Sequence, residues 1–564
     1  MNIQSVVKNI RNVMRQDKGI NGDAQRIEQF GWLLFLKIFD AKDEEMEVLD
    51  NSDSYCSPIE EKYRWRNWAK NTEGITGEPL INFIDKELFP YLRGLNVLNN
   101  KRAGLLQDVF SGNNNYMKNG NLLRQVINEL NAIDFHNLKD RHIFGEVYET
   151  ILKELQSAGA SGEFYTPRAI TLFLTEMVNP QLGEKILDPA CGTGGFLTAA
   201  IEHIRRTAQD NIEQRQILQN SIQGMELKPL PNMLAITNLI LHDIEVPDIA
   251  YEDSLLKYRD ITAKTRVDVI LANPPFGGNV DKETSEIFGA NFKTMESADL
   301  FVVMIINYLK QGGRAAIVLP DGSLTGDGVK ARIREKLLRD CNLHTIIRLP
   351  NSVFKPYATV ATNLLFFDKV KAPGDENTDF PTKEIWYYEH PYPEGSVSYS
   401  KTNPIDIKEF EPIKQWWNNR TESPLAWKIN IEEIINNADQ RAEIHRQNAA
   451  KATAKANDLK EKIRKLKFDT GKLTIDKEIE KGKLKLEKLE AELSETENTA
   501  KSESQTANLI YYSAFNLDYK NPASLIEKET EDIFEIISHL QKSQIETDNL
   551  INDIKKVLEA YHEV

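Results

Sequence analysis

The four residues Asn273-Pro274-Pro275-Phe276 could together act on a flat amino group. The carboxamide oxygen of Asn273 and the carbonyl oxygen of Pro274 could each accept one N–H of an exocyclic amine. Phe276 could stack on the ring that carries the amine. Accepting both hydrogens favours a pyramidal nitrogen, whose lone pair can attack an electrophilic methyl group without a general base of unusual pKa.

The same tetrapeptide directly follows the apolar run 267–272 and is also an ordinary turn after a strand. Proline fixes φ and blocks further strand pairing, so a turn needs no ligand to explain it. Taken alone, the four residues fit a turn and a binding site equally well.

A glycine loop upstream favours the binding site. Residues 185–196 read Lys-Ile-Leu-Asp-Pro-Ala-Cys-Gly-Thr-Gly-Gly-Phe, which predicts a short buried strand, a loop and then a helix over Leu197–Arg206. The glycines allow a ligand to approach the backbone closely. The spacing matches neither the dinucleotide fingerprint nor the phosphate-binding P-loop. Asp188 at the strand end would instead suit a ligand with a positively charged amino-acid head.

Two further carboxylates follow predicted strands. Glu226 ends the stretch Ser221–Glu226, at the position where doubly wound nucleotide folds bind ribose hydroxyls. Asp253 follows another short apolar stretch and could accept a hydrogen bond from an adenine amino group. A solvated loop carboxylate explains Asp253 almost as well.

The stretch 162–168 reads Gly-Glu-Phe-Tyr-Thr-Pro-Arg and precedes the apolar-periodic run 169–177. Thr166 as N-cap with Pro167 at the first helical position predicts a helix start. The functional alternative is a loop that crosses the ligand pocket.

In this order, the three motifs closely resemble those of the S-adenosylmethionine (SAM)-dependent adenine-N6 DNA methyltransferases. More narrowly, the chain resembles the methylation (M) subunit of a type I restriction-modification system. The resemblance covers most of the chain, including Asp140–Leu155 and the late stretch 516–522. It implies an α/β fold with a Rossmann-like methyltransferase core, and methyl transfer from SAM to N6 of an adenine flipped out of duplex DNA.

The resemblance implies that Asn273, Pro274, Pro275 and Phe276 hold the adenine and carry the catalysis. Cytosine-N4 enzymes tend to have Ser where this chain has Asn273, so adenine is favoured. Phe354 could face the other side of the base, although an aromatic residue capping the sheet edge fits equally well. The residues expected at SAM are Glu163, Phe164, Tyr165, Thr166, Pro167, Arg168, Asp188, Gly192, Thr193, Gly194, Gly195, Glu226 and Asp253.

Length and periodicity predict the architecture. A chain of 564 residues suggests about three domains, which we place at 1–135 (helical), 136–430 (methyltransferase) and 431–564 (helical, for partner docking). Apolar runs alternating with helical stretches predict a mostly parallel sheet covered on both faces. The family likeness suggests that the last two of these runs, His344–Leu349 and Asn363–Phe367, pair antiparallel at one edge.

After about residue 430 the composition shifts to Lys, Glu, Ala and Leu, and apolar spacings of three and four predict an antiparallel coiled-coil hairpin. Its mixed charges fit a solvated surface or an arm that grips a partner or DNA. A last helical segment, Leu525–Tyr561, could form a bundle with a helix of another subunit. The hairpin spacing is carried by Leu459, Ile463 and Leu466 before the turn at 469–471 and by Leu486, Leu489 and Leu493 after it.

The net charge of −15 and a pI near 5.3 leave no general basic surface to neutralise DNA phosphates. Between Phe367 and the hairpin there is a connector with strand-like and proline-rich pieces, not a large target-reading module. The resemblance to the family explains how such a chain could still act at a specific DNA site, because in that family a separate specificity (S) subunit recognises the target sequence. We expect the S subunit, a second M subunit and duplex DNA as partners, and leave open whether a restriction (R) subunit takes part.

The sequence favours a reduced cytoplasmic protein without a membrane span or a metal. The apolar segment 32–39 is too short, and too closely flanked by charge, to cross a membrane, and no secretory signal precedes it. Cys56, Cys191 and Cys341 show no metal-ligand spacing or disulfide framework. We interpret Cys191 as a small packing residue rather than a nucleophile.

Two other classes of function stay open from the residues alone. Protein-glutamine and RNA methyltransferases also use Asn-Pro-Pro-aromatic for planar amides, but usually lack such long helical flanks. The non-enzyme alternative is a scaffold subunit of a DNA-defence complex, in which the cofactor pocket is only structural.

Overall fold

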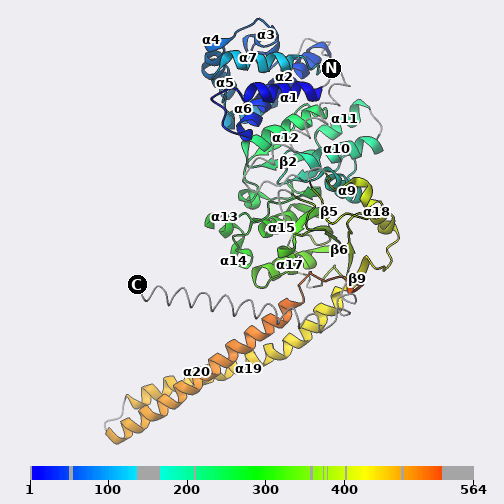
Figure 1. Cartoon of the computed structure of the whole chain (residues 1–564). Helices are drawn as coiled ribbons and strands as arrows, with labels where there is room; N and C mark the ends of the chain where they lie inside the picture. The colour runs from blue at the N-terminus through cyan, green and yellow to red at the C-terminus, as the bar shows by residue number, and fades with distance from the viewer. Residues whose placement is uncertain are drawn as a thin grey trace, which may run out of the picture.

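The computed structural model describes residues 3–49, 55–98, 100–135, 166–208, 211–355, 360–372, 374–375, 377, 379–400, 403–471 and 476–523. It is an elongated molecule with a helical N-terminal part, a central sheet covered by helices, and a long helical hairpin at the opposite end (Figure 1). Asp140–Leu155 and Leu525–Tyr561 lie outside the described residues. Within the described part, no helix is both long and apolar enough to cross a membrane.

The N-terminal part is helical, as predicted, and is built around the long helix α2. The apolar segment 32–39 lies inside α2, where its large apolar side chains are at most 2% exposed, so it forms core. The elements are α1 (Ile3–Met14), α2 (Asp23–Leu49), η1 (Glu61–Tyr63), α3 (Trp65–Trp68), α4 (Gly77–Asn82), the π-helical turn η2 (Phe83–Leu88), α5 (Phe89–Arg93), α6 (Lys101–Gly112) and α7 (Gly120–Asn131).

The central sheet has nine strands in the order β3-β2-β1-β4-β5-β7-β6-β8-β9. Strands β1 to β5 run parallel, and β7 is antiparallel to both of its neighbours, β5 and β6. The strands are β1 (Ile186–Asp188), β2 (Ile222–Glu226), β3 (Asp248–Tyr251), β4 (Val267–Ala272), β5 (Leu309–Pro320), β6 (Cys341–Leu349), β7 (Thr362–Lys369), β8 (Glu384–Glu389) and β9 (Ala426–Asn430).

The predicted antiparallel pairing of the two late strands, β6 and β7, is confirmed, but their place at the sheet edge is wrong. The connector after β7 adds β8 beside β6, and β9 beside β8. Tyr387 on β8 and Trp427 on β9 stack with ring centroids 5.4 Å apart and are almost fully buried. Burial of these aromatic side chains favours extending the sheet over leaving the connector in solvent.

Apolar side chains alternate across the sheet, which confirms that both faces are covered. On β4, Val269 and Leu271 join one hydrophobic cluster, whereas Ile270 and Ala272 join the other. One face is covered by α9 (Arg168–Val178), α10 (Gly195–Thr207) and α12 (Pro229–Leu241), and the other by α15 (Ser297–Tyr308) and α17 (Val329–Asp340). The remaining elements are α11 (Ile212–Gln219), η3 (Leu256–Asp260), α13 (Lys282–Ile287), α14 (Gly289–Phe292), α16 (Asp321–Leu324), η4 (Ile407–Phe410) and α18 (Glu411–Asn418).

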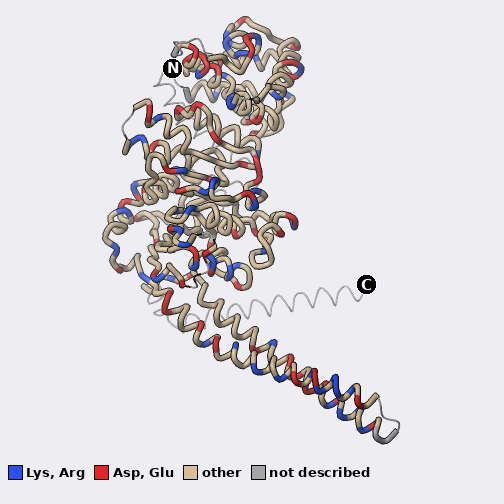
Figure 2. The backbone as a smooth tube through the Cα atoms, turned by 180° about the vertical axis from the view of Figure 1, so that it is seen from behind, with Lys and Arg blue, Asp and Glu red and all other residues tan. Residues whose placement is uncertain are grey.

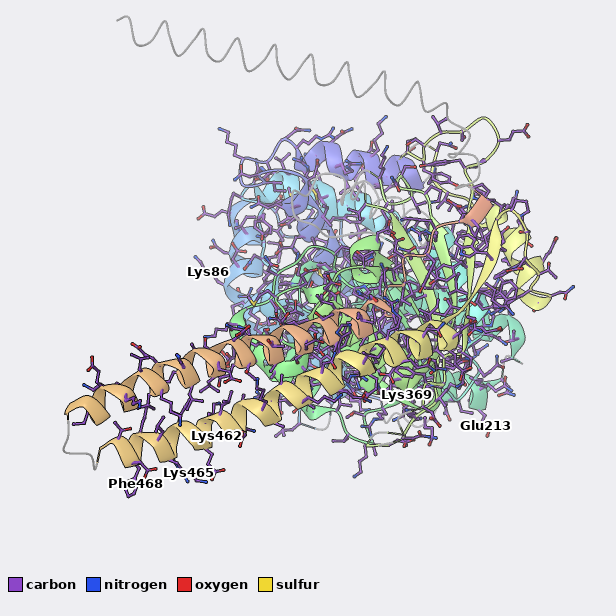
Figure 3. All side chains as sticks on the ribbon, turned by 90° about the horizontal axis from the view of Figure 1, so that it is seen from below. Lys86, Glu213, Lys369, Lys462, Lys465 and Phe468 are labelled. Carbon is purple, nitrogen blue, oxygen red and sulfur yellow. The ribbon has the colours of Figure 1, made fainter. Side chains whose placement is uncertain are left out.

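The predicted hairpin is present as two long antiparallel helices, α19 (Ile431–Thr470) and α20 (Asp476–Ser513), which lie side by side (Figures 1 and 3). Its seam includes Ala456, Leu459 and Ile463, each at most 7% exposed. The predicted spacing of three and four residues therefore does mark the contact between the two helices.

A short segment after α20, residues 514–523, returns to the sheet and is called the strap below. Leu517 N donates to Leu324 O at 2.9 Å, and Tyr387 Oη donates to Leu517 O at 3.0 Å. Arg348 and Asp518 form an ion pair at 2.7 Å. The hairpin is thus attached to the sheet at both ends, through β9 before α19 and through the strap after α20.

Two glycines of the helical part offer a matched test of this packing. A Cβ on Gly120 would lie 1.8 Å from the backbone oxygen of Gly77, whereas a Cβ on Gly104, the fourth residue of α6, would meet nothing within 4 Å. We expect Gly120→Ala to destabilise the protein by about 1–3 kcal/mol or more, because the backbone has to move. Gly104→Ala should leave stability unchanged or raise it by up to about 1 kcal/mol. Thermal melts of both variants would contradict this packing if the two behaved alike.

Candidate active site

A cavity of about 520 Å³ lies at the carboxyl ends of β1, β2 and β4, the edge of a parallel sheet where such folds bind ligands. Its size suits a small-molecule cofactor together with part of a substrate. The predicted site residues in its wall are Thr166, Asp188, Gly192, Thr193, Gly195, Glu226, Asp253, Asn273 and Pro275. The motifs 188–195 and 273–276, about 80 residues apart in the sequence, therefore meet at one cavity.

The glycine loop after β1 is fixed by the carboxylate of Glu226. Gly192 N donates to Glu226 Oε2 at 3.0 Å, and Lys228 N donates to Glu226 Oε1 at 2.8 Å. Gly192 and Gly194 have φ values of 52° and 82°, which an L side chain would strain. Glu226 thus joins the loop after β1 to the start of α12, and both sides of this junction line the cavity.

Asp188 is a buried carboxyl at the cavity wall, only 1% exposed. Burial raises its pKa to about 8, against a hydrogen bond from Ala190 N that lowers it, and the negative charge of Glu226 adds to the increase. A cation bound next to Asp188 would favour the ionised form and so be attracted there. Burial also raises the pKa of the Cys191 thiol well above its usual range, which agrees with a packing role for Cys191.

The side chain of Asn273 is oriented by Thr166. Asn273 Nδ2 donates to Thr166 Oγ1 at 2.9 Å, whereas Asn273 Oδ1 is buried and accepts no hydrogen bond from any described residue. A buried carbonyl oxygen without a donor is unusual and costs free energy. The arrangement leaves an acceptor beside the cavity that a ligand N–H can satisfy.

The prediction of Thr166 as N-cap of the following helix is wrong. Helix α9 begins at Arg168 with Pro167 as its N-cap residue and without a side-chain cap hydrogen bond. The Thr166 hydroxyl faces Asn273 instead, where it satisfies an amide donor that would otherwise be buried without a partner. Sequence spacing could not reveal this contact, because 107 residues separate the two.

The loop after Asn273 is held by the start of α15. Ser297 Oγ donates to Pro275 O at 3.0 Å, and Ser297 N donates to Gly278 O at 3.0 Å. Several wall residues of this loop escaped the sequence-based prediction, although the adjacent Gly277-Gly278 could have indicated a loop that folds over a ligand. Other wall residues not predicted are Thr171, Pro189, Ala190, Cys191, Phe196, Met225, Leu227, Lys228, Pro231, Ser254, Leu255, Asn279, Val280, Asp281, Thr284 and Phe301.

The two predicted stacking residues contact each other and do not line the cavity. Phe276 and Phe354 form an edge-to-face pair with ring centroids 6.2 Å apart and planes at 75°. They are 9% and 1% exposed, so this arrangement leaves no room for a base between them.

Other predicted site residues also lie away from the cavity wall. Gly194 packs toward α12, where a Cβ would meet Leu239 Cδ1 at 3.1 Å, and Arg168 pairs with Glu202 at 2.9 Å. Pro167 and Pro274 are likewise not part of the wall. Glu163, Phe164 and Tyr165 lie outside the described residues.

With this geometry in place, the sequence can be compared with known proteins. The profile of the family described as N-6 DNA Methylase matches residues 139–456, and that of the HsdM N-terminal domain matches residues 3–130. The EcoEI methylase subunit of a type I restriction enzyme from Escherichia coli is 49% identical over 444 residues, covering 77% of this chain and 88% of that protein. This chain is a type I restriction-modification methylase subunit.

Other members of the family are similar to this methylase subunit in sequence or structure over most of its length. The EcoKI methylase subunit of Escherichia coli K12 is 27% identical over 430 residues, covering 72% of this chain and 75% of that one. A Vibrio vulnificus YJ016 protein described as a type I modification subunit shares 44% identity at a TM-score of 0.69, over 76% of this chain and 92% of its own.

A further solved chain, from work on assembly and conformational transition of the type I system, shares 29% identity at a TM-score of 0.68 over 98% of both chains. Because the N-6 DNA Methylase profile and the EcoEI relative both match most of the methyltransferase region, the chain is a DNA methyltransferase subunit. The protein-glutamine and RNA methyltransferase alternatives therefore lose their support.

The buried carboxyl of Asp188 gives the methylase subunit a testable pH dependence. Between the usual pKa of 3.8 and the folded value of about 8, the unfolded chain has released a proton that the folded chain retains. The stability of the ligand-free protein therefore falls as the pH rises through this window, on the order of 1 kcal/mol per pH unit. Asp188→Asn keeps the acceptor for Ala190 N but has no proton to lose.

We therefore expect the melting temperature of Asp188→Asn to exceed that of the wild type by a margin that grows from pH 5 to pH 8. Melts of both proteins across this range check the expectation. Parallel curves would show that Asp188 is already ionised at neutral pH.

Proposed function

We propose that this chain transfers a methyl group from SAM to N6 of an adenine flipped out of duplex DNA, with the target sequence read by a separate specificity subunit. One observation carries the proposal. Asn273 Oδ1 is a buried acceptor with no donor among the described residues, in the wall of a cavity that also contains Asp188 and the glycine loop. An exocyclic amine that enters this cavity would meet an acceptor already in place.

The wall residues fit SAM. Asp188 suits its ammonium group, Glu226 its ribose hydroxyls, and Asp253 its adenine amino group, because carboxylate oxygens accept more than one hydrogen bond. Gly192, Thr193 and Gly195 leave the backbone accessible beside them. When bound, SAM supplies an electrophilic methyl group on a sulfonium.

The chain itself activates the amine. Asn273 Oδ1 accepts one N–H of the adenine amino group. The carbonyl of Pro274, which is not part of the cavity wall in the present arrangement, accepts the other after the loop 273–276 has shifted toward the base. These bonds strengthen as the nitrogen becomes pyramidal and positively charged, so they stabilise the transition state more than the ground state. The amide N–H of Asn273 is bonded to Thr166. Rotating the Asn273 oxygen away from the cavity would break this hydrogen bond.

Phe276 is the proposed stacking partner of the base, and Phe354 is proposed to face the other side of the base. Extruding a base from the duplex costs roughly a few kcal/mol, and aromatic stacking returns about 1–3 kcal/mol. Because Phe276 and Phe354 now contact each other edge to face, base binding requires Phe276 to swing toward the cavity or the pair to separate.

Partners complete the proposed activity. The chain has a net charge of −15, so it is poorly suited to bind and read DNA by itself. We assign sequence recognition to the specificity subunit, place a second methylase subunit in the assembly, and leave the restriction subunit as an optional addition. The region 431–564 is the proposed docking region, joined to the methyltransferase domain 136–430 and the helical domain 1–135.

The central test is Asn273→Ala, assayed with the specificity subunit present. We expect a loss of methylation of about 10²–10³-fold, as for the loss of one preorganised transition-state hydrogen-bonding group, while calorimetry finds nearly normal SAM affinity. Phe276→Ala should likewise lose methylation while keeping nearly normal SAM affinity. Mass spectrometry of the product nucleosides identifies the methylated base. Normal turnover in both variants, or methylcytosine as the product, would reject the assigned roles.

A second test concerns the orientation of the amide. Thr166→Val keeps the side-chain volume but leaves Asn273 Nδ2 without its acceptor, so the amide can turn its oxygen from the cavity. We expect kcat to fall about tenfold, roughly the worth of one hydrogen bond, with a smaller change in the KM for DNA. Thr166→Ser keeps the hydroxyl and should restore most of the rate. Equal rates in the Val and Ser variants would show that the hydroxyl does not position Asn273.

A further inference from the structure

Charge is unevenly distributed along the hairpin. Residues 460–471 and 479–488, called the distal segment below, contain nine Lys or Arg and four Asp or Glu, although the whole chain carries −15. The rest of the hairpin, residues 431–459 and 489–513, contains ten Asp or Glu and five Lys or Arg. Figure 2 shows charged positions crowded in the half of the hairpin near its turn. The arm is thus acidic near the sheet and basic toward its far end.

Several cations of the distal segment are available to an external partner. Lys481, Lys483, Lys485, Lys488 and Arg464 are exposed and have no acidic side chain within 4.0 Å among the described residues. Lysines at spacings of four and three, as at 481, 485 and 488, lie on one side of a helix.

Other lysines of the arm are already engaged, but only at the surface. Lys455 and Lys460 pair across the hairpin with Glu492 and Glu497, each at 2.7 Å. Lys462 and Lys465, labelled near the far end in Figure 3, pair with acids on their own helix and stay more than half exposed. Exposed pairs of this kind are worth little and exchange readily for a phosphate partner.

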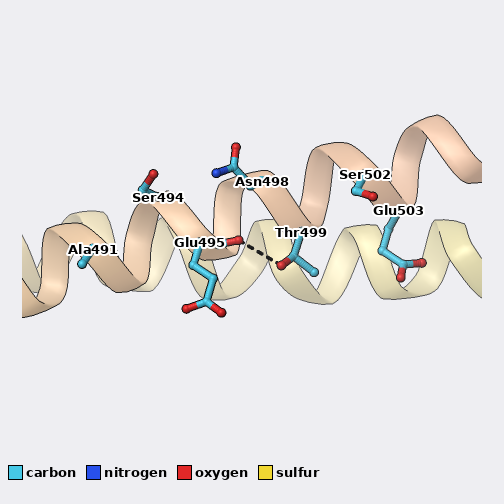
Figure 4. A pocket seen from close by; sticks show the side chains of 7 residues that line it. All are labelled: Ala491, Ser494, Glu495, Asn498, Thr499, Ser502 and Glu503. Carbon is cyan, nitrogen blue, oxygen red and sulfur yellow. Dashed lines mark hydrogen bonds between the residues drawn. The ribbon is translucent and has the colours of Figure 1, made fainter.

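The middle of α20 has the opposite character. It forms an open surface groove of about 640 Å³ lined by small and polar side chains and by Glu495 and Glu503 (Figure 4). Glu503 accepts from His445 of α19 at 2.7 Å. This acidic stretch would repel a polyanion, so attraction for one is confined to the distal segment.

The base of the arm is attached to the sheet at two places. Helix α19 continues directly from β9 at the edge of the sheet, and the strap returns the chain to the sheet after α20. At 1.5 Å per residue, the 40 residues of α19 give the arm a length of about 60 Å. In Figure 1 the arm points toward the same side of the molecule as α13 and α14, which follow the catalytic loop.

We propose that the distal segment of the hairpin binds the phosphate backbone of duplex DNA that flanks the target site. The inference rests on the proposed function, because it requires the duplex to lie at the cavity. An arm of about 60 Å matches the length of some 18 base pairs of B-DNA, at 3.4 Å per pair. The exposed lysines would add affinity without sequence preference, since phosphate contacts carry no base information.

The test compares two charge-neutralised variants of the full chain, each assembled with the specificity subunit. The distal variant carries Lys481→Gln, Lys483→Gln, Lys485→Gln and Lys488→Gln. The control, with the same change in charge in the part of the arm nearer the sheet, carries Arg441→Gln, Arg446→Gln, Lys451→Gln and Lys501→Gln. Glutamine preserves helix propensity, and circular dichroism verifies the fold.

Binding is measured against salt on two duplexes that share the target site, one with about 8 and one with about 30 flanking base pairs on each side. We expect the distal variant to lose about tenfold or more in affinity for the long duplex, and its log–log salt slope to fall by about 0.9 per lost phosphate contact. On the short duplex the distal variant should bind and methylate like the wild type. The control should match the wild type on both duplexes.

Two results would overturn the inference. One is wild-type affinity and salt slope of the distal variant on the long duplex. The other is failure of the distal variant to assemble with the specificity subunit in size-exclusion chromatography, which would assign the lysines to an acidic protein surface. Failure of the proposed function itself looks different, because the wild type would then methylate neither duplex.

Discussion

The carboxamide oxygen of Asn273 is the constraint on which the rest of the site depends. Leaving a buried acceptor without a donor costs about 1–3 kcal/mol, so the surrounding structure has to hold it in place. Strand β4 holds the backbone of Asn273 in place, because the preceding residue, Ala272, is fully buried and paired with β5. Thr166 fixes the side chain of Asn273 by accepting a hydrogen bond from its amide N–H. A donor that arrives through the cavity recovers the free energy that the empty acceptor costs.

The side of the cavity that Glu226 and Lys228 form depends on the helical domain as well as on the sheet. Helix α12 starts three residues after Glu226, and its other side packs on α2, where a Cβ on Gly31 would lie 2.5 Å from Met233 Cε. Arg102 of α6 donates to Glu245 O at 3.1 Å, just beyond the end of α12. The N-terminal domain therefore packs against the helix that follows Glu226 and Lys228, and it supports the part of the cavity wall that these two residues form.

The sequence indicated the parts of the site that are local in the chain. A strand followed by polar or glycine residues can be recognised from a few neighbours, and so Asp188, Gly192, Glu226 and Asn273 were all expected and all meet at the cavity. The same holds for the hairpin, whose seam follows a periodic spacing. These features need no knowledge of distant contacts.

The parts that sequence reasoning missed depend on long-range contacts. The bond between Thr166 and Asn273 joins residues 107 positions apart, so helix-start statistics favoured the wrong role for Thr166. The contact between Phe276 and Phe354 likewise needs the whole sheet in place. Strands β8 and β9 were missed as members of the sheet because each is short, and their pairing is decided by burial against the other strands.

The strap has a consequence for how this chain matures on the ribosome. Arg334 of α17 is 4% exposed, and it donates to the carbonyl oxygen of Phe515, 181 residues later in the chain. Until that carbonyl has been synthesised, a guanidinium of the methyltransferase core lacks one of its acceptors. The outer half of the sheet can reach its final packing only after Phe515 has been synthesised. A nascent chain cut short within the arm would lack the Phe515 carbonyl, so the buried guanidinium of Arg334 would have fewer acceptors.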